Sequence, residues 1–213
     1  MEPVCYIVGA APTGALPSPR EGDFLIAADK GYEALRAAGI APDLIMGDFD
    51  SLGYTPEGEN VLSHSPIKDD TDLMLAVRWA MARGWRRFVT YGALGGHRLD
   101  QTVASCQTLR YLADHGAAGR LVGDGWNVVL LRNGALRFPA SAAGWLSLFA
   151  SGNEARGVTL RGLKYALTDG TLTCGLPLGV SNEFLGQEAA IRVADGAVFV
   201  LWQGDVLPME EAL

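Results

Sequence analysis

The sequence is poor in cysteine and in positive charge, and it has no long apolar segment. Its 213 residues include only three cysteines. None of them lies in a CxxC pair or near a histidine at the spacing of zinc ligands. Three scattered cysteines are too few for a disulfide framework, so we interpret them as buried thiols.

Basic residues are outnumbered by acidic ones, 17 against 24, which gives a formal net charge of -7 at pH 7. This balance opposes sequence-independent attraction to nucleic acid or to an anionic membrane. No segment approaches the roughly eighteen apolar residues that span a bilayer, and the N-terminus lacks the basic and apolar segments of a signal peptide. We therefore expect a cytoplasmic protein with no nucleic-acid or membrane partner.

The pattern of apolar segments changes near residue 130, which predicts two domains, 1–130 and 131–213. In the first, short apolar runs alternate with amphipathic ones, typical of a mostly parallel sheet covered by helices on both faces. The expected strands are 5–9, 24–28, 44–47, 88–91 and 120–123, and the expected helices are 31–38, 73–81 and 101–115.

The second half favours an antiparallel sandwich or barrel, because its apolar runs are short and are separated by turn signals. Asn133-Gly134 and Asp195-Gly196 have the composition of hairpin turns. The expected strands are 128–131, 145–150, 158–160, 189–193 and 198–202.

Several acidic residues of the first half directly follow expected strands, where open parallel sheets place their ligand crevice. Asp29 follows the strand 24–28, and Asp48 and Asp50 follow the strand 44–47. If the chain turns after the strand 44–47, the carboxylates of Asp48 and Asp50 could both reach the same ion.

A third acidic cluster, Lys68-Asp69-Asp70-Thr71-Asp72, precedes a strong helical pattern. Backbone N–H groups and the positive end of the helix dipole would lie beside it. The simpler alternative is that Asp70 or Thr71 only caps the helix.

Hard oxygen ligands in this number suit Mg²⁺, which joins carboxylates to substrate phosphates. The sequence therefore predicts a phosphate-bearing substrate.

A glycine-rich segment, 92–100, connects an expected strand to an expected helix and could bring free N–H groups to phosphate oxygens. Arg98 adds a forked cation there. The loop after the first strand matches neither the P-loop, because Ala15 and Leu16 stand where Lys and Ser/Thr are needed, nor the GxGxxG fingerprint. A bound nucleotide would need another way of holding its phosphates.

Taken together, these motifs resemble those of the thiamine pyrophosphokinases, which convert thiamine and ATP to thiamine diphosphate and AMP. The resemblance spans most of the chain. It rests on Gly47-Asp48-Phe49-Asp50-Ser51, on 68–72, on the segment from Gly95 to Asp100, and on Gly162-Leu163-Lys164-Tyr165 with Ser181-Asn182-Glu183. It implies an α/β Rossmann-like N-terminal domain, an all-β C-terminal sandwich, and a homodimer that holds thiamine at the subunit interface.

The resemblance also implies roles for individual residues. Asp48, Asp50 and Asp72 would bind Mg²⁺, with Lys68 and Thr71 beside the nucleotide phosphates. Arg98 and Asp100 would complete the pocket for ATP, and Asp29 would lie in it. Ser181 and Asn182 would contact thiamine. The proton of the thiamine hydroxyl would leave to Asp100 or to one of the metal ligands.

The sequence departs from the family pattern in the glycine-rich segment, where His97 is inserted before Arg98. Two other functions are compatible with parts of the chain. Asp48-Phe49-Asp50-Ser51 resembles the nucleophile motif of haloacid-dehalogenase phosphatases, although that motif normally follows the first strand and here follows the third. A non-catalytic nucleotide sensor could keep the same fold.

Overall fold

The computed structural model describes residues 2–65 and 70–212, and its contacts divide the chain into two units, Met1–Asp124 and Gly125–Leu213. The second unit begins at a turn in which Asp124 and Gly125 both have positive φ, 52° and 74°. The predicted boundary between residues 130 and 131 falls inside β7 (Trp126–Arg132), which starts directly after this turn.

The described residues of the first unit form six strands in the order β6-β5-β1-β2-β3-β4, and every pair of neighbours is parallel. The strands are β1 (Cys5–Val8), β2 (Phe24–Ala28), β3 (Leu44–Gly47), β4 (Val61–Ser63), β5 (Arg87–Tyr91) and β6 (Ala118–Gly123). All five strands expected in this unit are present, within a few residues at their ends. The three-residue β4 is an addition at the sheet edge, too short and too little buried for its sequence to predict it.

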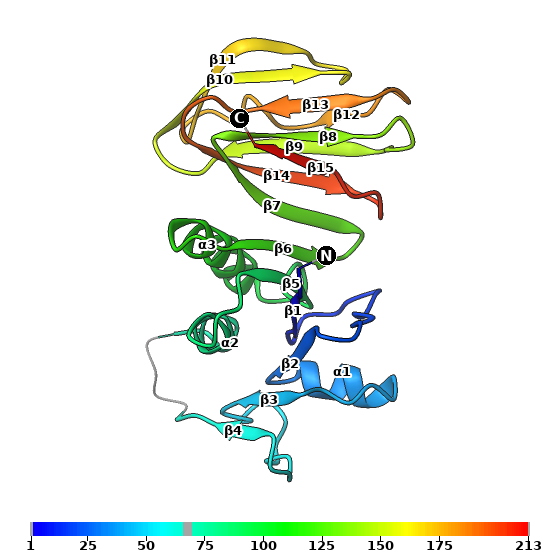
Figure 1. Cartoon of the computed structure of the whole chain (residues 1–213), viewed down its shortest axis with the longest axis vertical. Coiled ribbons are helices and arrows are strands. Elements are labelled where there is room, and N and C mark those ends of the chain that lie inside the picture. The colour runs from blue at the N-terminus through cyan, green and yellow to red at the C-terminus, as the bar shows by residue number, and fades with distance from the viewer. Residues whose placement is uncertain (1, 66–69, 213) are drawn as a thin grey trace. The chain divides into compact units, whose positions relative to one another are not determined.

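This sheet is covered by the helices α1 (Gly31–Ala37), α2 (Asp72–Met81) and α3 (Leu99–Asp114). Figure 1 shows α1 on one side of the strands and α2 and α3 on the other. On the α1 side, Leu35 packs into a cluster with Leu25, Ile45 and Phe49. All three helices were expected from the spacing of their apolar residues. Among the described residues no helix is both long and apolar enough to cross a membrane.

The second unit is built of antiparallel strands in two groups, β12-β9-β14-β7 and β11-β10-β13-β8-β15. Besides β7, the strands are β8 (Gly134–Phe138), β9 (Trp145–Ala150), β10 (Glu154–Arg161), β11 (Leu167–Thr173), β12 (Asn182–Glu183), β13 (Ala189–Arg192), β14 (Ala197–Gln203) and β15 (Met209–Ala212). The structure therefore confirms a β-rich second unit.

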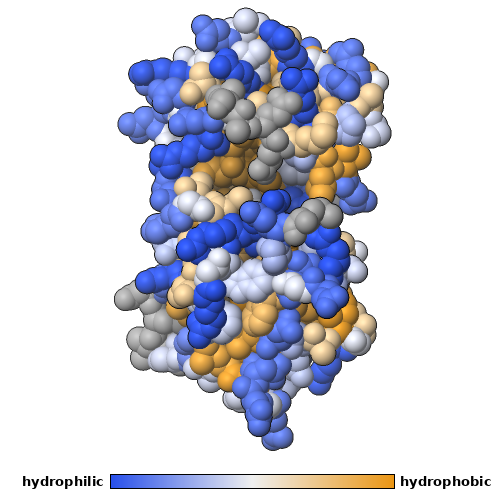
Figure 2. Space-filling view, in the orientation of Figure 1, coloured by the Kyte–Doolittle hydropathy of each residue, from blue (hydrophilic) through white to orange (hydrophobic). Residues whose placement is uncertain are grey.

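Side chains from both groups of strands form one core in this unit. The Phe138 ring on β8 lies 5.4 Å from that of Trp202 on β14 and 5.0 Å from that of Phe184, measured between ring centroids. Other large apolar side chains stay exposed, among them Trp145 and Leu178. On the face of the molecule drawn in Figure 2, apolar residues lie in patches between hydrophilic ones.

Candidate functional site

The first unit contains a cavity of about 460 Å³ at the carboxyl ends of its strands. From β1 the strand order runs one way through β2, β3 and β4 and the other way through β5 and β6. Open parallel sheets bind ligands where the order reverses in this way, here between β1 and β5. The cavity lies at this point, because its lining residues lie at or after the carboxyl ends of β1, β2, β3 and β5 or belong to α2 and α3. They are Gly9, Ala10, Ala11, Pro12, Ala28, Asp29, Lys30, Ser51, Asp72, Leu73, Thr90, Gly92, Ala93, Gly95, Gly96, His97, Arg98, Gln101 and Ser105.

Backbone hydrogen bonds fasten the connections after β1 and β5 to one another on one side of the cavity. The N–H of Gly9 donates to the carbonyl of Tyr91 at 2.8 Å, and the N–H of Ala11 donates to the carbonyl of Gly92 at 2.9 Å. The glycine-rich loop is also tied to the first turn of α3, since the N–H of Gly95 donates to Oγ1 of Thr102 at 3.1 Å. The loop is thus held in place before any ligand arrives.

Asp29 and Ser51 meet at another wall of the cavity. The hydroxyl of Ser51 donates a hydrogen bond to Oδ2 of Asp29. The other carboxylate oxygen of Asp29, Oδ1, is buried and has no hydrogen-bond partner among the described residues. The predicted ATP-site residue Asp29 therefore lies in the cavity, together with Ser51, for which the sequence predicts no role.

Asp48 and Asp50 lie in the turn after β3 and are not among the described residues that line the cavity. Oδ1 of Asp48 accepts a hydrogen bond from the N–H of Asp50 at 3.2 Å. Between them Phe49 has a φ of 62°, and its side chain is buried in the α1-side cluster. The buried ring anchors the turn that carries both carboxylates.

The start of α2 brings Asp72 to the cavity, where it lines the wall in the first helical turn. Thr71 caps the helix, because its Oγ1 accepts the N–H of Met74 at 3.1 Å. The capping alternative is thus confirmed for Thr71. Oδ2 of Asp70 instead accepts Nη1 of Arg78 at 2.6 Å. The predicted phosphate contact Lys68 lies outside the described residues.

The set Asp48, Asp50 and Asp72 remains a prediction as a metal site. In residues 2–65 and 70–212, no three aspartate, glutamate, histidine or cysteine side chains are close enough to form a metal site. The chemistry of the cavity nevertheless fits a hard divalent cation. Its wall carries the carboxylates of Asp29 and Asp72 and the hydroxyl of Ser51, and the buried Oδ1 of Asp29 can accept a cation or a hydrogen-bond donor.

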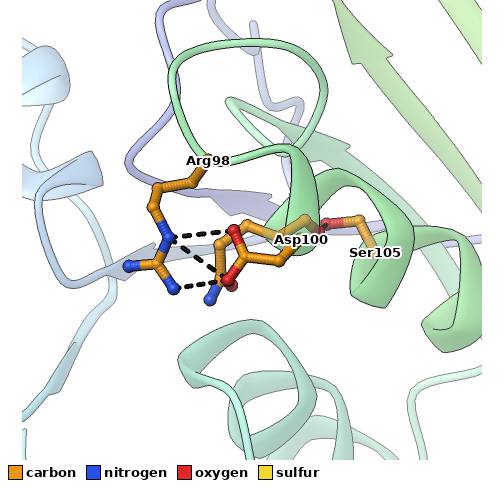
Figure 3. A network of polar contacts seen from close by, with 4 residues as sticks. Arg98, Asp100 and Ser105 are labelled. Carbon is orange, nitrogen blue, oxygen red and sulfur yellow. Dashed lines mark hydrogen bonds and ion pairs between the residues drawn. The ribbon is translucent and has the colours of Figure 1, made fainter.

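Arg98 and Asp100 form a two-pronged ion pair at the start of α3 (Figure 3). Nε of Arg98 lies 2.9 Å from Oδ1 of Asp100, and Nη2 lies 2.6 Å from Oδ2. The hydrogen bonds from Arg98 lower the pKa of the Asp100 carboxyl, and Asp100 raises the pKa of Arg98 in turn. Both groups therefore stay charged at neutral pH. Arg98 lines the cavity, as do His97 and Gln101, for which the sequence analysis proposed no role.

The predicted thiamine contacts Ser181 and Asn182 lie in the second unit, where Asn182 is buried with 3% of its surface exposed. Its Oδ1 accepts the N–H of Tyr165 at 2.9 Å, and its Nδ2 donates to the carbonyl of Tyr165 at 2.8 Å. In this structure the Asn182 side chain holds the Gly162–Tyr165 segment against β12. Ser181 is exposed, with a φ of 62°.

Two family models match this chain, one in each unit. The model described as "Thiamin pyrophosphokinase, catalytic domain" matches residues 20–118, and the model described as "Thiamin pyrophosphokinase, vitamin B1 binding domain" matches residues 135–198. The chain belongs to the thiamin pyrophosphokinase family. The cavity, from Gly9 to Ser105, thus lies largely within the catalytic domain of this family.

Relatives of nearly the same length agree with this membership. A curated thiamine pyrophosphokinase of Bacillus subtilis is 26% identical over 211 residues, covering 93% of this chain and 98% of the relative. The crystal structure of thiamine pyrophosphokinase from B. subtilis has a TM-score of 0.80 at 25% identity, covering 95% of this chain and 99% of the other. That of thiamin pyrophosphokinase from Geobacillus thermodenitrificans has a TM-score of 0.78 at 26% identity, covering 95% and 98%.

Family and structural matches together support thiamine diphosphokinase activity, so this member of the thiamin pyrophosphokinase family is a transferase. They do not favour the phosphatase alternative. The order of the elements also argues against the phosphatase. The Asp48-Phe49-Asp50-Ser51 motif follows the third strand of the chain, whereas the phosphatase motif normally follows the first.

Proposed function

We propose that the first unit is a Rossmann-like nucleotide-binding domain whose cavity binds ATP with Mg²⁺, and that the enzyme transfers the pyrophosphoryl group of ATP to the hydroxyl of thiamine. The observation that carries this proposal is the cavity between the ends of β1 and β5, with Asp29, Ser51, Asp72 and Arg98 in its wall. A triphosphate with a divalent cation complements these carboxylates and this guanidinium.

In the proposed reaction, the hydroxyl oxygen of thiamine forms a bond to the β-phosphorus of ATP. The bond between that phosphorus and the oxygen bridging to the α-phosphorus breaks, and AMP leaves with the bridging oxygen. The hydroxyl proton passes to Asp100 or to one of the predicted metal ligands. Such reactions depend mostly on positioning and on stabilisation of negative charge.

The chain's own residues would contribute positioning and charge. Arg98 would hold a phosphate oxygen with its fork of donors, and Thr71 and Lys68 would lie beside the phosphates. Mg²⁺, held by Asp48, Asp50 and Asp72, would neutralise the triphosphate and polarise the attacked phosphorus when bound. An acidic wall without a cation would repel ATP, so nucleotide binding should depend on the metal.

Incubation of the purified protein with MgCl₂, ATP and thiamine, followed by chromatography of the products, tests this function. We expect AMP and thiamine diphosphate in equal amounts, and neither product with excess EDTA. Release of inorganic phosphate without a thiamine product would favour the phosphatase. Binding of ATP with no product would favour the nucleotide sensor.

We further propose a cytoplasmic homodimer in which thiamine is held at the subunit interface by Ser181 and Asn182. The support for this arrangement is the resemblance of the motifs in both halves of the chain. Asn182 is buried, and its side chain is hydrogen-bonded to the backbone of Tyr165. It would therefore contribute to thiamine binding by positioning the segment 162–165. Sedimentation as a monomer under assay conditions would contradict the dimer.

A further inference from the structure

The hydrogen bond between Ser51 and Asp29 joins two chain segments that leave different strands. Asp29 directly follows β2, and Ser51 lies in the turn after β3. Both residues line the cavity, and the Ser51 hydroxyl donates to Oδ2 of Asp29. The bond therefore fixes one carboxylate oxygen of a cavity residue from the neighbouring strand end.

The second oxygen of the same carboxylate has no partner in the part of the chain that the structure describes. Oδ1 of Asp29 is buried and accepts no hydrogen bond from the described residues. A buried polar atom without a partner is costly, and such atoms in a folded protein call for an explanation. An acceptor kept ready for a ligand explains this one, because Asp29 lies in the wall of the cavity.

The backbone around Asp29 is fixed independently of its side chain. Its N–H donates to the carbonyl of Met46 at 2.8 Å, and its φ is 49°. Residues other than glycine adopt this left-handed conformation at a cost, and they are concentrated at functional sites. β3 passes so close that a Cβ on Gly47 would lie 3.1 Å from Cα of Asp29. With the main chain held, the only remaining freedom of Asp29 is rotation about its side-chain torsions χ1 and χ2.

We propose that Ser51 is a positioning residue for nucleotide binding. Its hydroxyl holds Oδ2 of Asp29 and thereby directs Oδ1 to the bound nucleotide, where it meets either the cation or a hydroxyl group of the nucleotide. This inference rests on the proposed function, since the ligand is the ATP and Mg²⁺ complex assigned to the same cavity. It predicts an effect on nucleotide affinity and none on the affinity for thiamine.

Two substitutions separate positioning from a general structural role. Ser51→Ala removes the hydroxyl, whereas Ser51→Thr keeps it, and Ser51 is exposed enough to admit the extra methyl group. Ser63→Ala is a matched control, because Ser63 ends the adjacent strand β4 and is not among the described lining residues. Calorimetric titration with ATP and Mg²⁺ gives the Kd, and steady-state kinetics give KM for ATP and for thiamine.

We expect Ser51→Ala to raise the Kd for ATP with Mg²⁺ about tenfold, in keeping with the loss of a hydrogen bond to a charged group. Its KM for ATP should rise in parallel, with KM for thiamine unchanged. Ser51→Thr should stay within about twofold of the wild type, and Ser63→Ala should not differ from it. A second titration, with 2′,3′-dideoxy-ATP and Mg²⁺, identifies the partner of Oδ1. An effect of Ser51→Ala that disappears with this ligand points to a nucleotide hydroxyl, and an effect that persists points to the cation.

Unchanged nucleotide affinity in Ser51→Ala would overturn the inference and leave the proposed function standing. Equal losses in the Ala and Thr variants, together with a lowered Tm, would also overturn it, because they indicate a structural role. The titrations do not require turnover. If the wild-type protein binds ATP with Mg²⁺ but makes no thiamine diphosphate, the proposed function fails while the role of Ser51 can still be measured.

Discussion

The guanidinium of Arg98 forms an ion pair with the carboxylate of Asp100, two residues further along the chain, with Nη2 and Oδ2 2.6 Å apart. The side chains are 68% and 62% exposed, so the pair contributes little to stability. Water screens this attraction, and an anionic ligand in the cavity could therefore draw the guanidinium away from Asp100. Binding of phosphate at Arg98 would then release Asp100 for contact with a substrate.

The variant Asp100→Asn tests whether this carboxylate takes part in the reaction. It removes the charge and keeps the shape, so we expect an unchanged fold and a fall in kcat of about a hundredfold or more, in line with the usual contribution of a general base. KM for ATP should not rise, because Arg98 remains. Steady-state kinetics and circular dichroism measure both quantities. A turnover close to that of the wild type would exclude Asp100 as the proton acceptor.

Asp48→Asn and Asp72→Asn should each abolish turnover while the protein stays folded. Both residues are only partly buried, and each substitution would remove a charged oxygen ligand from the predicted Mg²⁺ site. Turnover assays at increasing MgCl₂, with thermal unfolding as the check on folding, provide the measurement. Asp70→Asn serves as the control, because its carboxylate faces Arg78 and should be dispensable. Unfolding of the Asp48 or Asp72 variant would support a structural role instead.

Gly31→Ala should destabilise the first unit, because the first turn of α1 lies directly against the end of β1. A Cβ on Gly31 would stand 1.9 Å from the carbonyl oxygen of Val8, a backbone atom that cannot move aside. We expect a loss of about 1–3 kcal/mol or more in the free energy of unfolding, measured with urea. Gly14→Ala is the matched control, since nothing lies within 4 Å of the added methyl group. Equal stability of the two variants would contradict the close packing at Gly31.

Stability at low pH should depend on Asp23, whose side chain is only 3% exposed. Burial raises the pKa of this carboxyl, but the N–H groups of Arg20 and Val4, each 2.8 Å from one of its oxygens, outweigh burial and leave the pKa below its usual value. Because the pKa is lower in the folded state, the stabilisation is present above about pH 4 and disappears as the pH falls through the folded-state pKa.

The variant Asp23→Ala should therefore be less stable than the wild type by about 1–3 kcal/mol at pH 7. The difference should shrink as the pH is lowered below 4. Urea unfolding at a series of pH values gives the measurement. A difference that stays constant down to pH 2 would show that the hydrogen bonds to Asp23 are not what the substitution removes.

The strands and helices of the first unit were predictable because each carries a clear apolar pattern. Leu73, Val77 and Met81, spaced four residues apart, predict α2, and the buried run 24–28 predicts β2. The sequence did not predict β4, β8, β11, β12 and β15. Two of them, β4 and β11, lack a clear apolar pattern. Val61–Ser63 is short, and Leu167–Thr173 is mostly polar and exposed, so tertiary pairing decides both strands.

The site was predictable where acidic residues follow a strand or begin a helix, as do Asp29 and Asp72, which both line the cavity. Ser51 and the unpartnered oxygen of Asp29 were not, because a hydrogen bond between two strand ends leaves no periodic signal in the sequence. The burial of Asn182 was not predictable either, because the sequence does not distinguish an exposed asparagine from a buried one whose amide holds a loop.

A crystal structure with Mg²⁺ and α,β-methylene-ATP, in which the bond that must break is replaced by an inert one, would show where the nucleotide and its cation bind. We expect the triphosphate in the cavity between the ends of β1 and β5, with the cation bound by Asp48, Asp50 and Asp72 and Arg98 on a phosphate oxygen. Nucleotide density elsewhere on the chain, with these three carboxylates pointing away from the cation, would contradict this expectation.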